Sequence, residues 1–404
     1  MAGPLSHIKV LELSRVLAGP WAAQTLADLG ADVVKVERPG AGDDTRTWGP
    51  PWAGEGEDRQ AAYFLSTNRG KRSVTIDFER PEGQELVRRL AAEADVVIEN
   101  FKVGGLKKYG LDYESLKAVN PRLVYCSVTG FGQTGPYAPR AGYDFMIQGL
   151  GGLMSITGLP DGEPGGGPVK VGVAVTDVFT GLYATIGIMG ALAHRDRTGE
   201  GQMVDMALLD VQVAILANQA MNCLVSGKAP QRLGNAHPNI VPYQAFPTRD
   251  GHIILAIGNN GQFAKFCTAA GRPELAQDPR FADNAARVAH RADMVAILTD
   301  LMPTRTTREW LDALEPLGVP CGPINDLQAV FEDPQVQARG LRQDLPHPVL
   351  GSVPTVANPI RYSATPLAHD RAPPMLGADT DDVLGGQLGL GAEDIAALRD
   401  KGVI

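Results

Sequence analysis

The sequence predicts an α/β fold in which helices cover a parallel sheet. Three observations indicate it. Short apolar runs alternate with helix-like segments through the first third of the chain, glycine and proline mark the joins, and the links are short. Repeated strand–helix–strand units imply right-handed crossovers and therefore parallel strands, as in doubly wound folds.

The elements expected in this first third follow one another in regular order. Strands are expected at residues 8–13, 32–36, 73–78, 95–99 and 123–128. Helices are expected at 19–30, from 81 to about 92, and around 113–119. Pro20 near the start of the first helix and Gly30 at its end are typical of helix termini.

Longer helices are expected in the middle of the chain. They cover residues 143–156, 176–193 and 208–224, and a charged turn at 195–202 leads into a strand at 203–206. The 176–193 segment is apolar on most sides, and a helix that is apolar all round is typically buried. We therefore expect this helix to lie inside the protein.

A stretch rich in Gly, Pro and Asn at residues 226–239 predicts a linker. Beyond it, strands at 243–247 and 252–257 flank the turn at 248–251, which is a hairpin signal, and helices follow around 261–270, 289–301, 307–314 and 392–399. We expect residues 1–225 to begin a large Rossmann-like domain, 226–330 to form a smaller α/β domain, and 331–404 to return to the large domain.

Composition limits the classes of function. A net charge of −9 argues against broad nucleic-acid or anionic-membrane surfaces, so a phosphate-bearing ligand would need a local basic cluster. The four cysteines show no CxxC spacing, which favours a reducing compartment and no metal site. The sequence begins without a secretory signal pattern and contains no uninterrupted apolar stretch of about 20 residues. A cytoplasmic location is expected.

Several common catalytic motifs do not occur in the sequence. It contains no GxSxG, HExxH or P-loop motif, and no GxGxxG follows the first predicted strand. Dinucleotide binding by the first strand–helix unit is therefore only weakly indicated.

Six blocks, in order along the chain, resemble the class III CoA-transferases, the carnitine and formyl-CoA transferase family. They are RVLAGPWAAQTLADLGADVVKVERPGAGDDTR (15–46), NRGKRSVTIDF (68–78), DVVIENFKVGGLKKYGLDY (95–113), VTGFGQTGPYAPRAGYDF (128–145), VGVAVTDVFTGLYATIGIMGAL (171–192) and GVPCGPINDLQAVFEDPQVQARG (318–340). The resemblance implies a large Rossmann-like domain, a smaller α/β domain and a homodimer whose two subunits are interlocked like chain links.

Asp177 matches the catalytic aspartate of that family. By position alone, an aspartate at the start of a helix is more often an N-cap. The resemblance instead implies a nucleophile that attacks an acyl-CoA thioester, giving an acyl-aspartyl anhydride and then an aspartyl-CoA thioester from which the acceptor acid takes CoA. CoA and its thioesters would be substrates, with no permanently bound cofactor and no metal.

The same blocks imply a CoA and substrate site. The candidate residues are Val16, Leu17, Ala18, Arg38, Lys71, Arg72, Asn100, Phe101, Lys108, Arg140, Tyr143, Asp144, His237 and Asn239. Arginine suits phosphate because its planar fork donates two parallel hydrogen bonds, although such basic residues also occur on solvated faces. The segments 235–239 and 259–261 are both candidates for a loop that closes over the substrate.

Substrate choice is partly constrained. The formyl-CoA transferase pattern has a glutamine where Leu17 stands and a tetraglycine loop that does not occur in this sequence, which argues against formyl or oxalyl substrates. The blocks AGYDF, GGGPVKVGVAVTD and LGNAHPNIVPYQ most resemble the branch that includes succinyl-CoA:glutarate transferases. A dicarboxylate needs a second polar site, for which Arg140 and His237 are candidates.

Two alternative functions remain. The 2-methylacyl-CoA racemases share GQTGP and the following GxD motif, but they carry a histidine acid/base before that aspartate. Tyr143 stands there in this chain, and tyrosine, with an ordinary pKa near 10, is a poor base at neutral pH. A non-enzymatic CoA-binding role would leave the motif around Asp177 unexplained. Transfer of CoA is the expected function, and racemisation is the alternative.

Overall fold

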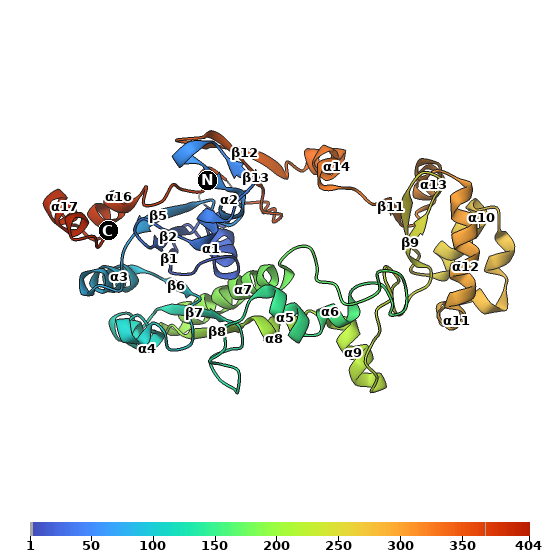
Figure 1. Ribbon diagram of the computed structural model, residues 1–404, viewed down its shortest axis with the longest axis horizontal. Coiled ribbons are helices and arrows are strands. Elements are labelled where there is room, and N and C mark those ends of the chain that lie inside the picture. Colours follow the sequence, from blue (N-terminus) through green and yellow to red (C-terminus); the bar gives the residue numbers. More distant parts are fainter. Residues whose placement is uncertain (1–2, 368) are drawn as a thin grey trace. The chain divides into compact units, whose positions relative to one another are not determined.

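The computed structural model describes residues 3–367 and 369–404, and the chain divides into two compact units (Figure 1). The first unit contains the residues up to Gly152, Val171–Leu216 and Pro334–Ile404, and the second contains Leu153–Lys170 and Ala217–Asp333. The domain ranges expected from the sequence differ from these units because they leave 153–170, 217–225 and 331–333 in the large domain.

Six parallel strands form the sheet of the first unit. They are β1 (Lys9–Glu12), β2 (Asp32–Glu37), β5 (Lys71–Thr75), β6 (Val96–Glu99), β7 (Val124–Thr129) and β8 (Met203–Ala207). Their spatial order is β5-β2-β1-β6-β7-β8, the doubly wound order of Rossmann folds. The predicted α/β class with a parallel sheet is confirmed.

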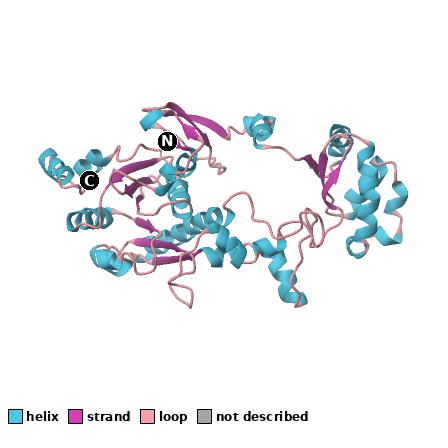
Figure 2. Ribbon diagram, in the orientation of Figure 1, coloured by secondary structure: helices cyan, strands magenta, loops and turns pink. Residues whose placement is uncertain are grey.

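Helices cover both faces of this sheet (Figure 2). One face is covered by α1 (Ala18–Asp28), α5 (Asp144–Leu150), α7 (Val175–Thr198) and α8 (Leu208–Ala214). The other is covered by α3 (Pro81–Glu93), α4 (Tyr113–Val119), α16 (Thr380–Gly386) and α17 (Ala392–Asp400). Neighbouring residues of a strand enter opposite cores, as Val10 and Leu11 do in β1. The strand sequences are nearly continuous stretches of apolar residues because both faces of the sheet are buried.

Helices α1 and α7 pack closely where α7 carries Gly181. A Cβ atom on Gly181 would lie 2.7 Å from the carbonyl oxygen of Ala18 and 2.9 Å from the Cβ of Trp21. Only glycine permits this approach of the two helices. Since Gly181 follows Asp177 by one turn of α7, the contact keeps Asp177 near the amino end of α1.

Some predicted boundaries are wrong, for local reasons. The helix predicted at 143–156 is two helices, α5 and α6 (Leu153–Ile156), because Gly152 between them has φ 86°. The helix predicted at 208–224 is also two, α8 and α9 (Ala217–Ser226), and Ala217 has φ 46°. The strand predicted at 73–78 begins earlier, at Lys71, which places that lysine inside the sheet.

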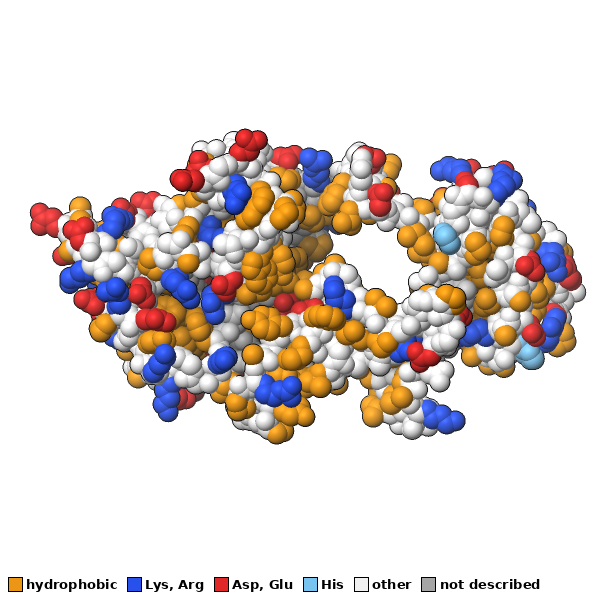
Figure 3. Space-filling model, in the orientation of Figure 1, with side chains coloured by type: hydrophobic (Ala, Val, Ile, Leu, Met, Phe, Trp, Pro, Cys, Tyr) orange, Lys and Arg blue, Asp and Glu red, His pale blue; other side chains and the backbone are white. Residues whose placement is uncertain are grey.

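Helix α7 is not buried on all sides, so that expectation is also wrong for the single chain. Its exposed apolar side chains are Phe179, Leu182, Tyr183, Ile186 and Met189. Figure 3 shows apolar side chains gathered at the surface over α5 and α7. Among the described helices taken singly, α7 alone has the length and apolar composition of a membrane span, but its Thr180, Ala184 and Ile188 are buried in the core of the unit.

The second unit contains a small antiparallel sheet in the order β11-β10-β9. Its strands are β9 (Tyr243–Pro247), β10 (His252–Ala256) and β11 (Cys321–Pro323), so the predicted hairpin is confirmed. Besides α6 and α9, its α-helices are α10 (Asn260–Ala269), α11 (Asn284–Ala289), α12 (Arg291–Leu301), α13 (Thr307–Leu314) and α14 (Leu327–Glu332). Trp310 is fully buried in the core, and its indole N–H donates to the carbonyl of Met302 at 2.7 Å.

The first unit also contains elements that the sequence did not predict. They are β3 (Trp52–Ala53), β4 (Gln60–Ala61), α2 (Ala62–Thr67), α15 (Pro334–Ala338), the hairpin of β12 (Arg342–His347) and β13 (Gly351–Val356), and α16. The hairpin packs its buried Leu345 and Val353 with Leu65 of α2.

Candidate active site

A pocket of about 860 Å³ opens at the carboxyl ends of the parallel strands, and all the residues that line it belong to the first unit. Its walls include the segments that directly follow β1, β2, β6 and β7. Ligands bind at this position in doubly wound sheets because the loops diverge where the strand order reverses, here between β1 and β6. The volume suits a cofactor-sized ligand.

The structure brings most of the predicted site residues together around this pocket. Those that line it are Val16, Leu17, Ala18, Arg38, Asn100, Phe101, Lys108, Arg140, Tyr143 and Asp177. Asp144 follows Tyr143 and contacts the backbone of Asp177.

Asp177 lies in the first turn of α7 but does not cap the helix. The capping position is Ala174, which makes no side-chain hydrogen bond. Asp144 supplies the cap: its Oδ1 accepts from the N–H of Thr176 at 2.8 Å and from the N–H of Asp177 at 3.3 Å. No residue in the described part of the chain donates a hydrogen bond to the Asp177 carboxylate. That carboxylate is therefore available to react.

Asp144 is itself held in place from two directions. The amide nitrogen of Gln148 donates to its Oδ2 at 2.6 Å. The chain just before it crosses the end of β7, where a Cβ on Gly142 would lie 2.4 Å from the Cα of Gly130. Glycine at both crossing points allows the two backbones to touch, which fixes the start of α5 and with it the cap on α7.

The environment of Asp177 changes its acidity. Burial raises the pKa of Asp177 to about 7, and the negative charge of Asp144 adds to the rise. The amino end of α7 acts in the opposite direction because its N–H dipoles favour an anion. A carboxylate with a raised pKa is a stronger base and nucleophile once ionised, and a large fraction is ionised at neutral pH.

The loop between β1 and α1 forms another part of the pocket wall and has a strained conformation. Val16 has φ 74°, a left-handed value that costs a β-branched residue about 1–3 kcal/mol. The residue before Val16, Arg15, is held by the side-chain amide of Asn100. The Oδ1 atom of Asn100 accepts from the N–H of Arg15 at 2.9 Å, and its Nδ2 donates to the Arg15 carbonyl at 2.6 Å. Asn100 thus shapes the loop as well as lining the pocket.

Basic side chains gather on the pocket wall, although the chain as a whole is acidic. The Arg38 side chain is exposed and has no ion-pair or hydrogen-bond partner among the described residues. The Lys108 ammonium lies 4.5 Å from the centre of the Tyr109 ring. The Arg140 guanidinium lies 4.5 Å from the ring of Tyr137 and 5.0 Å from that of Phe131. These groups form the local basic cluster that a phosphorylated or carboxylated ligand requires.

The structure corrects the predicted positions of Lys71 and Arg72, neither of which lines the pocket. Lys71 is fully buried, and its ammonium contacts Glu12 at 2.8 Å, Asn68 at 2.8 Å and the carbonyl of Pro20 at 3.0 Å. Arg72 points to the opposite face of β5 and pairs with Asp32 at 2.5 Å. Both residues belong to the strand, which begins before the predicted start.

His237 and Asn239 belong to the second unit, so their predicted part in the site stays a prediction. The backbone N–H of Asn239 donates to Nδ1 of His237 at 3.1 Å, and the His237 ring lies 5.1 Å from that of Tyr243. Burial lowers the pKa of His237, and the charge of Arg291 lowers it further. The imidazole is therefore neutral at physiological pH.

Sequence reasoning missed a buried charge network behind the strained loop. Its central residues are Glu12 of β1, Lys35 of β2 and Asp43, all 0–1% exposed. Glu12 and Lys35 could have been found from the sequence, because each lies inside a predicted strand that is buried on both faces. A charged residue in such a strand is almost never buried without a partner. Among the described residues, no group of three or more His, Cys, Asp or Glu side chains is arranged to hold a metal.

Comparisons with known proteins agree with this geometry and confirm the resemblance carried by the six blocks. The sequence model of CoA-transferase family III matches residues 5–380. The chain is 57% identical over 383 residues to a succinate–glutarate CoA-transferase of Agrobacterium fabrum, covering 94% of this chain and 95% of that protein. It is 44% identical over 401 residues to the succinyl-CoA:glutarate CoA-transferase of Homo sapiens, covering 99% and 90%.

The fold is similar to the crystal structure of a CaiB/BaiF family protein from Brucella suis. The TM-score is 0.85 and the sequence identity 56%, over 96% of this chain and 100% of that one. With sequence and fold matched over nearly the whole length, the chain belongs to CoA-transferase family III.

Proposed function

We propose that this protein transfers CoA from a dicarboxylic acyl-CoA, such as succinyl-CoA, to a second dicarboxylic acid of glutarate type, through a covalent intermediate on Asp177. The observation that carries the proposal is the Asp177 carboxylate itself, which faces the pocket with its helix already capped by Asp144. The names of the two relatives described above support the substrate class.

The reaction proceeds in four exchanges. An Asp177 oxygen attacks the thioester carbonyl of the donor, the C–S bond breaks, and CoA leaves as a thiolate. The thiolate attacks the Asp177 side of the anhydride, forming an aspartyl-CoA thioester and releasing the donor acid. The acceptor carboxylate attacks that thioester and again frees the thiolate, which then attacks the acceptor side of the new anhydride. Asp177 is regenerated, and each step exchanges groups of similar energy.

Each exchange passes through a tetrahedral oxyanion that needs donors aimed at it. The amino end of α1 is suited to this role. The first N–H groups of a helix have no intrahelical partner, and the N-cap residue of α1, Leu17, supplies no side-chain hydrogen bond. Leu17 and Ala18 line the same pocket as Asp177. The close contact at Gly181 keeps the two helix ends near each other.

Recognition of the two ends of the substrate is assigned to separate basic groups. Arg38 and Lys108, on the segments after β2 and β6, bind phosphate groups of CoA. Arg140 binds the distal carboxylate of the dicarboxylate, since its guanidinium is oriented by two aromatic rings. His237 is the other candidate for the distal carboxylate.

The protein acts as a homodimer with interlocked subunits. The exposed apolar face of α7 supports a second copy, because contiguous apolar surface of this kind marks interaction sites. Separately tagged preparations, mixed in native buffer, should form no mixed dimers. They should form them after the two are unfolded and refolded together. A monomer at micromolar concentration in sedimentation, or free exchange of subunits, would contradict the interlocking.

Replacing the proposed nucleophile gives the most direct test. Asp177→Asn should fold with normal stability and bind CoA thioesters, but it should lose nearly all transfer, because an amide cannot form the anhydride. The rate of thioester exchange, with CoA esters identified by mass, measures the effect. Wild-type enzyme treated with acyl-CoA and hydroxylamine should also be modified at this residue alone. Near-normal transfer by a verified Asp177→Asn protein would falsify the mechanism.

The activity should depend on pH through Asp177. Only the ionised carboxylate attacks, and its pKa is raised to about 7. The ratio kcat/KM should therefore rise roughly tenfold per pH unit below this value and become constant above it. Binding of a CoA thioester by Asp177→Asn over the same range separates titration of the ligand from that of the enzyme. A wild-type profile that is flat from about pH 5 to about pH 9 contradicts the assignment.

The two arginines that sequence reasoning treated alike should behave differently. Arg38→Ala should weaken binding of CoA thioesters by roughly ten- to a hundredfold, because it removes a charge-assisted hydrogen bond. Arg72→Ala is the matched control and should leave affinity unchanged, because Arg72 pairs with Asp32 away from the pocket. Calorimetric titration measures both. Equal affinities for the wild type and Arg38→Ala would show that the phosphates bind elsewhere.

A further inference from the structure

Three consecutive residues of the loop between β1 and α1 have their main-chain groups held by side chains from elsewhere. The carbonyl of Ser14 accepts from the Lys35 ammonium at 2.8 Å. The N–H and carbonyl of Arg15 both bond the Asn100 amide. The N–H of the third residue, Val16, donates to Asp43 at 3.2 Å. The main chain of this loop is therefore fixed by side chains of β2, of the segment after β6 and of Asp43, and not by its own turn hydrogen bonds.

The conformation that these contacts enforce is unfavourable by itself. Val16 has φ 74°, and a β-branched residue adopts left-handed backbone only where its surroundings impose it. Glycine would adopt the same φ without strain. The loop is therefore held in a shape that its own sequence opposes.

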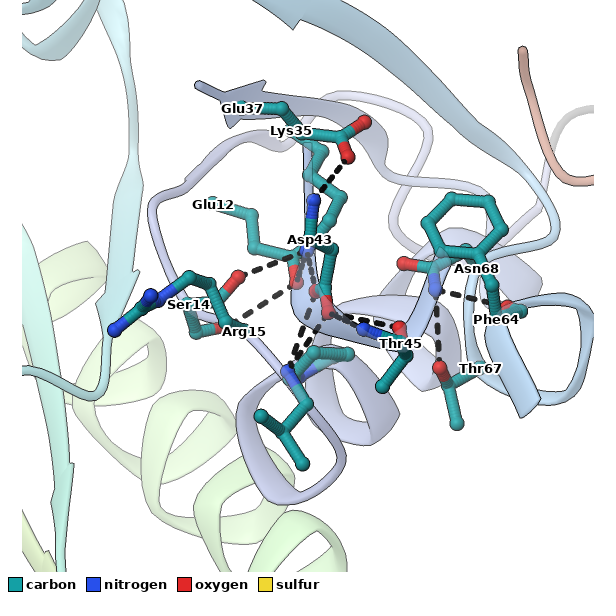
Figure 4. A network of polar contacts seen from close by, with 12 residues as sticks. Glu12, Ser14, Arg15, Lys35, Glu37, Asp43, Thr45, Phe64, Thr67 and Asn68 are labelled. Carbon is teal, nitrogen blue, oxygen red and sulfur yellow. Dashed lines mark hydrogen bonds and ion pairs between the residues drawn. The ribbon is translucent and has the colours of Figure 1, made fainter. Parts of the chain in front are cut away.

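Asp43 connects this strained residue to the charge network (Figure 4). Its Oδ2 lies 2.9 Å from the Lys35 ammonium, which also contacts Glu12 at 3.1 Å. Its Oδ1 accepts from the N–H and the hydroxyl of Thr45 at 3.0 and 2.7 Å. Asp43 has little freedom to move, because its side chain is buried and both of its carboxylate oxygens are hydrogen-bonded or ion-paired.

Asp43 and Lys35 remain charged at all physiological pH values. Burial alone would raise the pKa of Asp43, but Lys35 and the Thr45 N–H hold it at about 2. Burial likewise disfavours the Lys35 ammonium, yet Glu12, Asp43 and Glu37 together raise the pKa of Lys35. The contact with Val16 is therefore permanent and does not act as a pH switch.

We propose that Asp43, supported by Lys35, is a positioning residue for CoA transfer: it holds Val16 in the left-handed conformation and thereby fixes the Val16–Ala18 wall of the pocket that Asp177 also lines. The inference rests on the proposed function of Asp177. Asp43 acts through the backbone and contacts no reacting atom. If the Val16–Ala18 wall shifts, its backbone N–H groups no longer point at the oxyanion that forms in the transition state. The value of kcat should therefore fall, whereas the affinity for CoA esters should not change.

The test compares Asp43→Asn with the double variant Asp43→Asn/Val16→Gly. The amide keeps the shape of Asp43 but removes its charge and replaces one of its two acceptor oxygens, both of which contact the Val16 N–H, by an NH₂ group that cannot accept. We expect kcat to fall roughly ten- to a hundredfold, while affinity for the CoA thioester stays within about threefold. Glycine at residue 16 should restore a large part of kcat in the double variant, since it adopts the required φ without the contact. Loss of stability alone predicts no such rescue.

Asp28→Asn is the matched control. Asp28 forms another buried ion pair, with Arg69 at 2.6 Å, in the same unit and away from the pocket. It should lower the melting temperature as Asp43→Asn does, with kcat of the folded enzyme unchanged. If Asp43→Asn does not fold, Thr45→Val replaces it, because it removes one hydrogen bond to Asp43 and keeps both charges. That variant should lower kcat severalfold with unchanged affinity.

Wild-type kcat in Asp43→Asn, or a double variant no faster than the single one, overturns the inference. Amide exchange of the peptide that contains Val16 provides a readout independent of turnover, and it should accelerate in Asp43→Asn but not in Asp28→Asn. Faster exchange with an unchanged kcat also overturns the inference. The proposed function fails in a different way, through transfer that persists in Asp177→Asn, and the two failures are therefore distinguishable.

Discussion

The cap that Asp144 places on α7 is the interaction on which the rest of the site depends. A helix that begins at a pocket exposes unpaired N–H groups, and the nearest carboxylate is the natural partner for them. If Asp177 filled this role, its oxygens would be committed to hydrogen bonds and its pKa would be lowered. Because Asp144 takes the N–H groups of Thr176 and Asp177, the second carboxylate stays uncommitted, and burial raises its pKa to about 7. Two aspartates thus acquire different properties from their surroundings alone.

Close backbone contacts fix the position of the Asp144 cap relative to the amino end of α1. Gly142 against Gly130 fixes the chain that carries Asp144, and Gly181 against Ala18 fixes α7 to the start of α1. Each contact is too short for any residue larger than glycine. The amino ends of α1 and α7 can therefore move little relative to each other. The sheet supplies the remaining constraint, since the reversal of strand order between β1 and β6 opens the space in which a ligand fits.

The fold class, the succession of strands along the first third of the chain and the place of Asp177 at the start of a helix could be predicted from the sequence, because apolar periodicity and ordered motifs are local signals. Lys71 shows why other residues could not be. Its neighbours look like a basic loop, and a start of β5 only two residues earlier turns the side chain into the core. Asp43 carries no local signal at all, since its role depends on Lys35 and Val16, which come together only in the folded chain. Helix α7 looked buried because its sequence is apolar on most sides, yet Phe179, Ile186 and their apolar neighbours on one face are exposed in the structure.

Buried charge at the edge of the sheet also has to be explained by function and not by stability. Moving Glu12, Lys35, Asp43 and Lys71 out of water costs several kcal/mol per ion, and apolar residues of similar size often serve stability as well or better. What apolar residues cannot do is hold main-chain groups at fixed points. Here the ions bond the carbonyls of Ser14 and Pro20 and the N–H of Val16, all between the end of β1 and the first turn of α1. A strained loop beside an uncommitted carboxylate requires directional contacts of this kind, and the Asp43–Lys35 pair, which stays charged through the physiological pH range, keeps the contact with Val16 the same as pH changes.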